Sequence, residues 1–188
     1  MLARRICQTL QAIVAVVALT TVTASYASAA ETGAQAPFGD KVSTALFNYN
    51  RATPYIGTAG RYDPAAVAEI KALGFATVID LRAQSEKGMS GVAQAVQAAG
   101  LEYANIPVTT KAPTDDQVQE FAHLVENPAN YPILVNCVSA NRVGAMWALY
   151  RASAGVPVEV AIEEGRTTGL KPSREKAVRE RLGAPPMN

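Results

Sequence analysis

The sequence PILVNCVSANRVG, residues 132–144, decides the fold and carries most of the chemical information in this chain. Residues 133–135 are consecutive aliphatic side chains, which is typical of a short buried parallel strand. Residues 142–154 are expected to form a helix, and Gly155 provides its C-terminal stop. Cys137 therefore lies between a strand and a helix, where backbone N–H groups converge.

This arrangement predicts an anion-binding loop with a nucleophile. N–H groups at a helix N-terminus bind anions, and the same geometry stabilises a thiolate. Arg142 adds a planar guanidinium that can donate two hydrogen bonds to one anion. An arginine is unfavourable to the dipole near a helix start, so a purely structural role explains it poorly. We expect Cys137 and Arg142 to be catalytic. The expected substrate-binding residues of this phosphate-binding loop are Val138, Ser139, Ala140, Asn141 and Val143.

Three of these loop residues carry more specific expectations. Asn141 fits a left-handed backbone position. Ala140 stands where a tight anion loop often has glycine. Ser139 either donates to the thiolate or satisfies a loop carbonyl, and the sequence leaves both roles open.

Strand and helix signals alternate through the rest of the chain. This alternation predicts a single α/β domain with a mostly parallel central sheet of about four to five strands flanked by helices. The expected strands are 55–57, 76–81 and 103–108, and the expected helices are 63–73, 91–99, 114–125, 158–164 and 173–182. Ligands of such sheets bind beyond the carboxyl ends of the strands, where Cys137, Asp80 and Arg82 fall.

The N-terminus has the pattern of a secretory signal peptide. Arg4 and Arg5 precede an apolar stretch at residues 12–22, and Ala27-Ser28-Ala29 is a cleavage signal. The alternative is an uncleaved membrane anchor, for which the apolar stretch is short. We therefore expect a signal peptide at 1–29, a flexible start at 30–45, one α/β domain at 46–183 that contains the Cys137 loop, and a tail at 184–188. Export predicts a periplasmic protein that is free of the membrane after cleavage.

Charge and metal-ligand content exclude several classes of function. The chain has 17 Lys and Arg against 16 Asp and Glu, for a net charge of +1. Removal of residues 1–29 would take away two arginines and no acidic residue, leaving a net charge of −1. Neither value indicates a nucleic acid or an anionic membrane as a partner. The single histidine and the cysteines do not supply a usual metal site, so we expect no metal and no cofactor.

The predicted cleavage also removes Cys7 and leaves Cys137 as the single cysteine. Exported proteins usually keep cysteines in pairs, so a lone thiol is either functional or an inert core residue. Its place between the strand and Arg142 favours function.

A phosphatase also needs a general acid for the leaving oxygen. Asp80 ends a predicted strand near the site and is our first candidate, with pairing to Arg82 as the alternative. Asp115 and Asp116 lie in the first turn of a predicted helix, where carboxylates stabilise the helix dipole regardless of function. Glu86 is a weaker candidate in the loop after Asp80.

Several segments together resemble one known family. They are residues 74–82 with Glu86, residues 106–108, residues 132–150 and Gly169-Leu170. They are similar to the phosphatase-like domain of the beta-lactamase-hydrolase-like proteins, within the protein-tyrosine-phosphatase-like and dual-specificity-phosphatase-like superfamily. The resemblance spans residues 47–182. It implies a Cys137 nucleophile, an anion-binding Arg142 and loop amides from residues 138–143.

We therefore expect an exported cysteine-dependent hydrolase that cleaves phosphate monoesters through a thiophosphate on Cys137. Ordinary tyrosine and dual-specificity phosphatases place five residues between the cysteine and the arginine, whereas this chain has the four residues 138–141. The same loop length occurs in rhodanese-like sulfurtransferases, which leaves open an enzyme that carries a persulfide on Cys137. A non-catalytic module that binds a phosphorylated or other small oxyanion is the third alternative. The oligomeric state is not predicted.

Overall fold

The computed structural model describes residues 40–187. The predicted signal peptide at 1–29 and the first ten residues of the predicted flexible start lie outside the described residues. Residues 40–45, which the sequence assigns to that flexible start, make definite contacts. The Asp40 side chain, for example, is fully buried and pairs with Arg51 at 2.6 Å. The packed part of the chain thus extends upstream of the predicted boundary at residue 46.

A five-stranded sheet organises the domain in the order β1-β2-β5-β3-β4. The strands are β1 (Asn50–Thr53), β2 (Ile56–Ala59), β3 (Thr77–Asp80), β4 (Glu102–Asn105) and β5 (Ile133–Asn136). β1 runs antiparallel to β2, and the other neighbours are parallel. The central strand β5 places Ile133 opposite both Ile56 and Thr77. The expected α/β class with a mostly parallel sheet is therefore confirmed.

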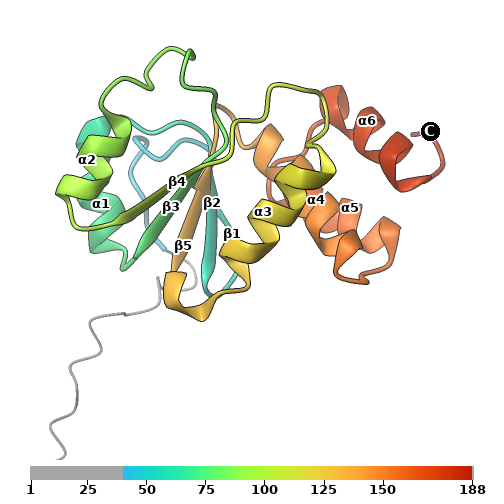
Figure 1. The fold of residues 1–188 in the computed structure, drawn as a ribbon, viewed down its shortest axis with the longest axis horizontal. Helices are drawn as coiled ribbons and strands as arrows, with labels where there is room; N and C mark the ends of the chain where they lie inside the picture. The colour runs from blue at the N-terminus through green and yellow to red at the C-terminus, as the bar shows by residue number, and fades with distance from the viewer. Residues whose placement is uncertain (1–39, 188) are drawn as a thin grey trace, which may run out of the picture. The chain divides into compact units, whose positions relative to one another are not determined.

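Helices cover both faces of this sheet, as Figure 1 shows. They are η1 (Pro64–Ala66), α1 (Val67–Ala72), α2 (Val92–Ala98), α3 (Asp115–Val125), η2 (Pro128–Asn130), α4 (Asn141–Ser153), α5 (Val158–Thr167) and α6 (Pro172–Leu182). One face packs against α1 and α2 through Leu134 and Val78, whereas Val135 and Ile79 face α3–α6. This division follows from the alternation of side chains along a strand.

Helix α4 lies at the centre of its layer. Residues 142–149 are all buried, because α4 packs against α3, α5 and α6 as well as the sheet. A Cβ atom added to Gly144 would lie 2.1 Å from the Leu170 backbone nitrogen and 2.5 Å from the Gly165 oxygen. Glycine at 144 thus permits the close approach that brings the segment before α6 against the start of α4.

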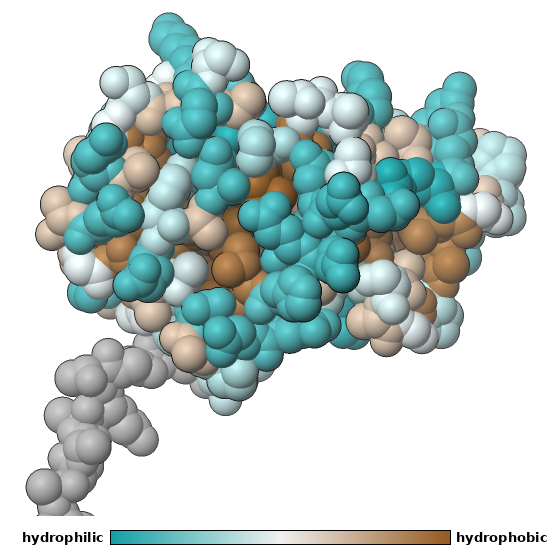
Figure 2. All heavy atoms as spheres, viewed as in Figure 1, coloured by the Kyte–Doolittle hydropathy of each residue, from teal (hydrophilic) through white to brown (hydrophobic). Residues whose placement is uncertain are grey.

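The sequence analysis missed one strand and extended another. All four residues of β1 are only partly buried and its sequence NRAT is largely polar, as an edge strand permits. β4 ends at Asn105 instead of residue 108. The N–H groups of Ile106 and Val108 still donate to the carbonyls of Asp80 and Leu81, and the Val108 carbonyl accepts from Arg142. On the face shown in Figure 2, hydrophilic side chains cover most of the surface and hydrophobic patches show between them. No helix within residues 40–187 is both long and apolar enough to cross a bilayer.

Candidate active site

The loop between β5 and α4 is fixed against the carboxyl end of β2. The Cys137 N–H donates to the Ala59 carbonyl at 3.3 Å, and the Arg61 N–H donates to the Val138 carbonyl at 2.9 Å. The Asn48 amide donates to the Ser139 carbonyl at 3.2 Å. The Cys137 side chain is buried, with 1% of its surface exposed. These contacts hold the cysteine at the predicted carboxyl edge of the sheet.

Ala140 provides the left-handed turn that starts α4. Its φ is +65°, whereas Asn141 is the first residue of the helix. The sequence analysis placed the left-handed position at Asn141, and that prediction is wrong. Gly169 packs directly on this turn, because a Cβ there would lie 2.6 Å from the Ala140 Cβ. The neighbouring glycine leaves room for an alanine where a tight loop usually has glycine.

The loop presents several N–H groups without a protein acceptor. Within residues 40–187, the backbone N–H groups of residues 138, 139 and 141–143 donate no hydrogen bond, and the internal hydrogen bonds of α4 begin with Gly144. Orphan donors at a helix N-terminus bind anions. The predicted loop amides are thus brought together at the start of α4.

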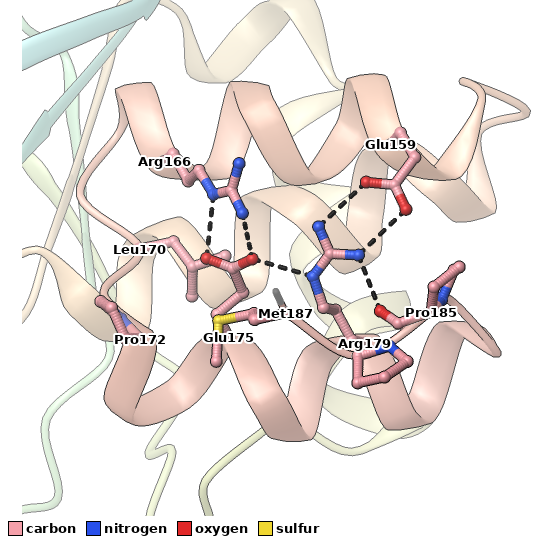
Figure 3. Close-up of a pocket in the computed structure, with 9 residues that line it drawn as sticks. Glu159, Arg166, Leu170, Pro172, Glu175, Arg179, Pro185 and Met187 are labelled. Carbon is pink, nitrogen blue, oxygen red and sulfur yellow. Dashed lines mark hydrogen bonds and ion pairs between the residues drawn. The ribbon is translucent and has the colours of Figure 1, made fainter.

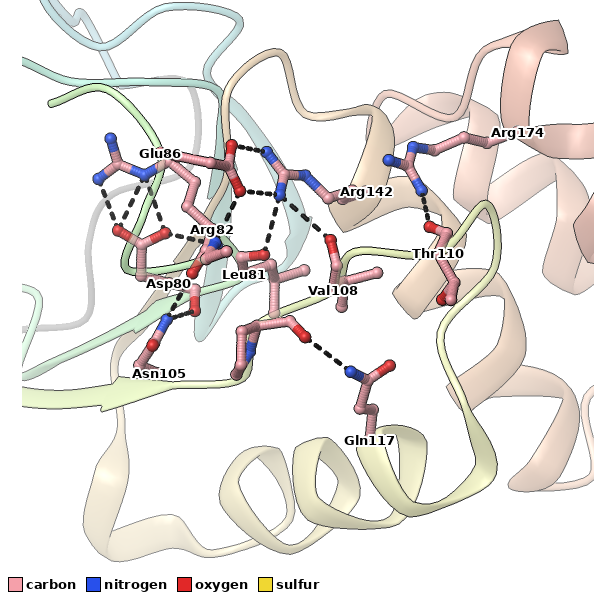
Figure 4. A network of polar contacts seen from close by, with 12 residues as sticks. Asp80, Leu81, Arg82, Glu86, Asn105, Val108, Thr110, Gln117, Arg142 and Arg174 are labelled. Atoms are coloured by element: carbon pink, nitrogen blue, oxygen red, sulfur yellow. Dashed lines mark hydrogen bonds and ion pairs between the residues drawn. The ribbon is translucent and has the colours of Figure 1, made fainter. Parts of the chain in front are cut away.

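Arg142 points back from α4 to the ends of β3 and β4 (Figure 4). Its Nη1 and Nη2 donate to the two Glu86 carboxylate oxygens at 2.6 and 2.7 Å. Nη1 also donates to the carbonyls of Leu81 and Val108, each at 3.2 Å. Within residues 40–187 no oxygen atom accepts from Nε or from the second Nη2 hydrogen, and the side chain that hydrogen-bonds this guanidinium besides Glu86 is Cys137. These donors are therefore available to an anion that binds at Cys137.

Electrostatics tie this arginine to both of its neighbours. Glu86 is the main cause of the raised pKa of Arg142, and the nearby Cys137 sulfur raises it further. A guanidinium beside the sulfur stabilises negative charge on it. Conversely, the Arg142 guanidinium holds the pKa of Glu86 below its ordinary value. Glu86 is therefore ionised at neutral pH and positions Arg142, which does not fit the weaker expectation that it donates a proton.

Asp80 lies at the end of β3 but is committed to Arg82. Its two oxygens accept from Arg82 Nε and Nη2 at 3.0 and 2.6 Å, and Oδ1 also accepts the Arg82 N–H at 2.9 Å. The Asp80 side chain has no exposed surface. A buried carboxylate in such a charge-assisted pair is a poor proton donor. The geometry favours the pairing alternative over the role of general acid.

The other two acid candidates are not brought to the loop. Asp115 is 97% exposed and pairs with Arg181 on α6. Asp116 lines a shallow hollow on α3 together with Ala104 and His123. Both therefore fit the role of stabilising the start of α3.

The remaining loop side chains have distinct environments. The Val138 side chain is 39% exposed and, with Glu86, lines a hollow of about 710 Å³ beside the loop. The Asn141 side chain accepts from the Lys171 N–H at 2.8 Å and donates to Ser173 Oγ at 3.0 Å. Asn141 therefore anchors the start of α6 to the loop instead of pointing a side-chain donor at a ligand.

Arg174 lies beside the candidate site, and the sequence analysis did not single it out. It extends from α6 toward Arg142 (Figure 4), and its Nη1 donates to the carbonyls of Thr110 and Lys111 at 2.5 and 2.9 Å. Burial is the main cause of its lowered pKa, and repulsion from Arg142 adds to it, whereas Cys137 and Glu86 oppose the shift. No local pattern distinguishes Arg174 from the other arginines of α6, so only the fold identifies it.

Comparison with known proteins agrees with this architecture. A family model described as "DSP-PTPase phosphatase fused to NAD+ Kinase" matches residues 63–180. The chain is 35% identical over 85 residues to a probable chloroplastic NAD kinase 2 of Oryza sativa subsp. japonica. That match covers 41% of this chain but only 9% of the curated relative.

Solved structures share the fold. TpbA of P. aeruginosa, in complex with pTyr, superposes with a TM-score of 0.57 at 19% identity, over 76% of this chain and 91% of that chain. Because the family model covers more than half of the sequence, the chain belongs to the DSP-PTPase phosphatase family. It is a cysteine-based phosphatase-like hydrolase, and the expected superfamily is confirmed.

Proposed function

We propose that this protein hydrolyses phosphate monoesters through a thiophosphate intermediate on Cys137. The observation that carries the proposal is the Arg142 guanidinium beside Cys137, at a loop where the N–H groups of residues 138, 139 and 141–143 have no acceptor within residues 40–187. A phosphoryl group needs such a nucleophile and such donors for its equatorial oxygens. That TpbA was crystallised with pTyr supports a substrate of this class.

In the first step the Cys137 thiolate attacks phosphorus. A sulfur–phosphorus bond forms, and the bond to the leaving oxygen breaks with its electron pair on that oxygen. In the second step water attacks phosphorus, the sulfur–phosphorus bond breaks, and the thiolate returns. The loop N–H groups and Arg142 stabilise the charge on the equatorial oxygens in both steps. Glu86 keeps Arg142 in place, and Asp80 keeps Arg82 in place.

We also propose that residues 1–29 direct export and that the enzyme acts in the periplasm. The support is the charged, apolar and small-residue pattern of the N-terminus. N-terminal sequencing of protein recovered from the periplasmic fraction tests this point. Mature protein that begins at Ala30 is expected, and full-length protein retained with the membranes would contradict it.

The test of the activity uses reduced protein, an aryl phosphate and, separately, thiosulfate with cyanide as the sulfur acceptor. Phosphate release that is lost in Cys137→Ser is the expected result. The four-residue loop favours sulfur transfer as the second candidate, so transfer from thiosulfate without phosphate release would replace the proposal. A Cys137→Ser variant that still releases phosphate at the wild-type rate would exclude the thiophosphate route.

A further inference from the structure

Arg174 differs from the other sheltered arginines of the chain in its lack of a carboxylate partner. Within residues 40–187, every other buried or half-buried arginine pairs with an acid. These pairs are Arg51 with Asp40, Arg82 with Asp80, Arg142 with Glu86, Arg151 with Glu164, and Arg179 with Glu159 and Glu175. Arg174 is half-buried and makes no ion pair there. A desolvated guanidinium without a counter-ion costs free energy, which an anionic ligand would recover.

The Arg174 guanidinium lies beside that of Arg142 (Figure 4). Nη1 is occupied by the carbonyls of Thr110 and Lys111, whereas Nε and Nη2 have no acceptor within the described part of the chain. Its charge interacts with Arg142, Cys137 and Glu86. Two guanidinium groups thus lie close together at one loop, and each has donors that no oxygen atom accepts within the described residues.

The position of Arg174 is fixed by contacts at the start of α6. The Asn141 side chain holds both Lys171 and Ser173, and the segment before α6 packs on Ala140 through Gly169. The carbonyls of Thr110 and Lys111 hold the guanidinium itself. A side chain anchored at both ends loses little entropy on binding an anion.

The site has more positive charge than one phosphoryl group requires, and the carboxylates described near it already have hydrogen-bond partners. The loop N–H groups and Arg142 already serve the transferred group, so Arg174 is additional. Glu86 and Asp80 are held by arginines, and Asp63, which lines the hollow beside the loop, accepts the Ala65 N–H at the start of η1. Residues 107–114 contain no acid. Such a site suits a leaving group that departs as an anion without protonation. A leaving phosphate has a pKa of about 6, against about 10 for a phenol.

We infer that Arg174 binds the leaving half of a phosphoanhydride substrate, such as a nucleoside diphosphate or inorganic diphosphate. This inference rests on the proposed Cys137 chemistry and extends it from phosphate monoesters to phosphoanhydrides. Cys137 attacks the terminal phosphorus, and the bridging oxygen leaves with its electron pair on the departing phosphate. Arg174 neutralises that charge. Water then cleaves the sulfur–phosphorus bond and releases orthophosphate.

The kinetic test compares ADP with para-nitrophenyl phosphate in the wild type and in Arg174→Gln, Arg174→Lys and Arg181→Gln. Loss of a charge-assisted contact should lower kcat/KM for ADP by about 10- to 100-fold in Arg174→Gln. The effect on the aryl phosphate should stay below about threefold, since that substrate has no second anion. The kcat/KM of Arg174→Lys for ADP should lie between that of the wild type and that of Arg174→Gln. Arg181→Gln removes the same charge from the same helix and should change neither substrate.

Equal losses on both substrates in Arg174→Gln would overturn the inference, because Arg174 would then serve the transferred phosphoryl group. A binding measurement separates this result from failure of the proposed function. Titration calorimetry on Cys137→Ser should show tighter binding of inorganic diphosphate than of orthophosphate, and adding Arg174→Gln should remove the difference. Equal binding of the two anions overturns the inference, even where the wild type hydrolyses aryl phosphate normally.

Discussion

This protein has two clusters of arginines that differ in how many carboxylate partners their guanidinium groups have. At the C-terminal end, Arg166 and Arg179 share Glu175, and Arg179 also grips Glu159 and the Pro185 carbonyl (Figure 3). At the catalytic loop, Arg142 meets one carboxylate and Arg174 meets none within residues 40–187 (Figure 4).

Hollows of similar size lie in the two regions. The one at the C-terminal end is about 730 Å³ and is lined by Arg166 and Arg179, and the one beside the loop is about 710 Å³ and is lined by Glu86 and Val138. Size therefore does not separate a binding site from a structural one. The two kinds of site are separated by their guanidinium donors. Donors that already have protein acceptors stabilise the fold, whereas donors without a protein acceptor are available to a substrate.

The largest contrast is expected from Arg142→Lys against Arg179→Lys. Lysine keeps the positive charge but loses the planar fork. At position 142 we expect kcat to fall by about 10²- to 10³-fold, as for the loss of one donor to transition-state charge. At position 179 we expect unchanged kcat and a lower midpoint of thermal unfolding. Similar losses of kcat in both variants, measured with an aryl phosphate, would contradict the division into two clusters.

Removal of the Glu175 carboxylate, which Arg166 and Arg179 share, should lower stability and leave activity unchanged. Glu175 is 3% exposed at its side chain and faces two arginines, so Glu175→Gln leaves buried positive charge without its counter-ion. We expect the free energy of unfolding in urea to fall by about 2–3 kcal/mol. Activity should persist below the melting transition. Glu163→Gln, at a 63% exposed side chain that also pairs with Arg166, is the matched control and should change stability by less than about 0.5 kcal/mol.

The same network should give the fold an acid-sensitive component. Hydrogen bonds from Arg166 and then from Arg179 lower the pKa of Glu175. A carboxyl whose pKa is lower in the folded state stabilises the protein above its unfolded pKa of about 4.3, and that stability is lost as the pH falls through the folded pKa. The free energy of unfolding, measured in urea, should therefore fall more steeply between about pH 5 and pH 3 in the wild type than in Glu175→Gln. Parallel pH curves would show that Glu175 is not the source.

The smallest catalytic effect is expected at Asp80, a paired carboxylate inside the catalytic region. Asp80→Asn should lower stability because Arg82 loses its partner. It should leave unchanged the ratio of kcat values for aryl and alkyl phosphates. A general acid would instead be worth about 10²- to 10⁴-fold, mainly on the alkyl substrate. A selective loss of that size would restore Asp80 as the proton donor.

Local sequence was sufficient to predict the centre of the candidate site, because the strand, the loop and the helix that form it follow one another in the chain. The aliphatic run before Cys137 and the helix after it place Cys137 and Arg142 together without knowledge of the rest of the fold. The parallel sheet followed from the alternation of strand and helix signals. The edge strand β1 escaped detection because its residues are polar and half-buried.

The partners of the site came from distant segments. Glu86 lies 56 residues from Arg142 in the sequence. The sequence therefore could not show whether the Glu86 carboxylate holds an arginine or donates a proton. Arg174 reaches the loop only because Gly144, Gly169 and Asn141 bring α6 against α4. The left-handed turn fell on Ala140 instead of Asn141 because Gly169 makes room for it. Contacts of this kind depend on tertiary packing, which periodicity and spacing do not encode.

Mass spectrometry of protein quenched during turnover of an aryl phosphate tests the central claim most directly. If the loop delivers a phosphoryl group to Cys137, the peptide that contains Cys137 will carry a phosphoryl adduct in the wild type. The adduct should form more slowly in Arg142→Lys, and turnover should be absent in Cys137→Ser. Steady phosphate release without an adduct on Cys137, or release that continues in Cys137→Ser, would contradict the account.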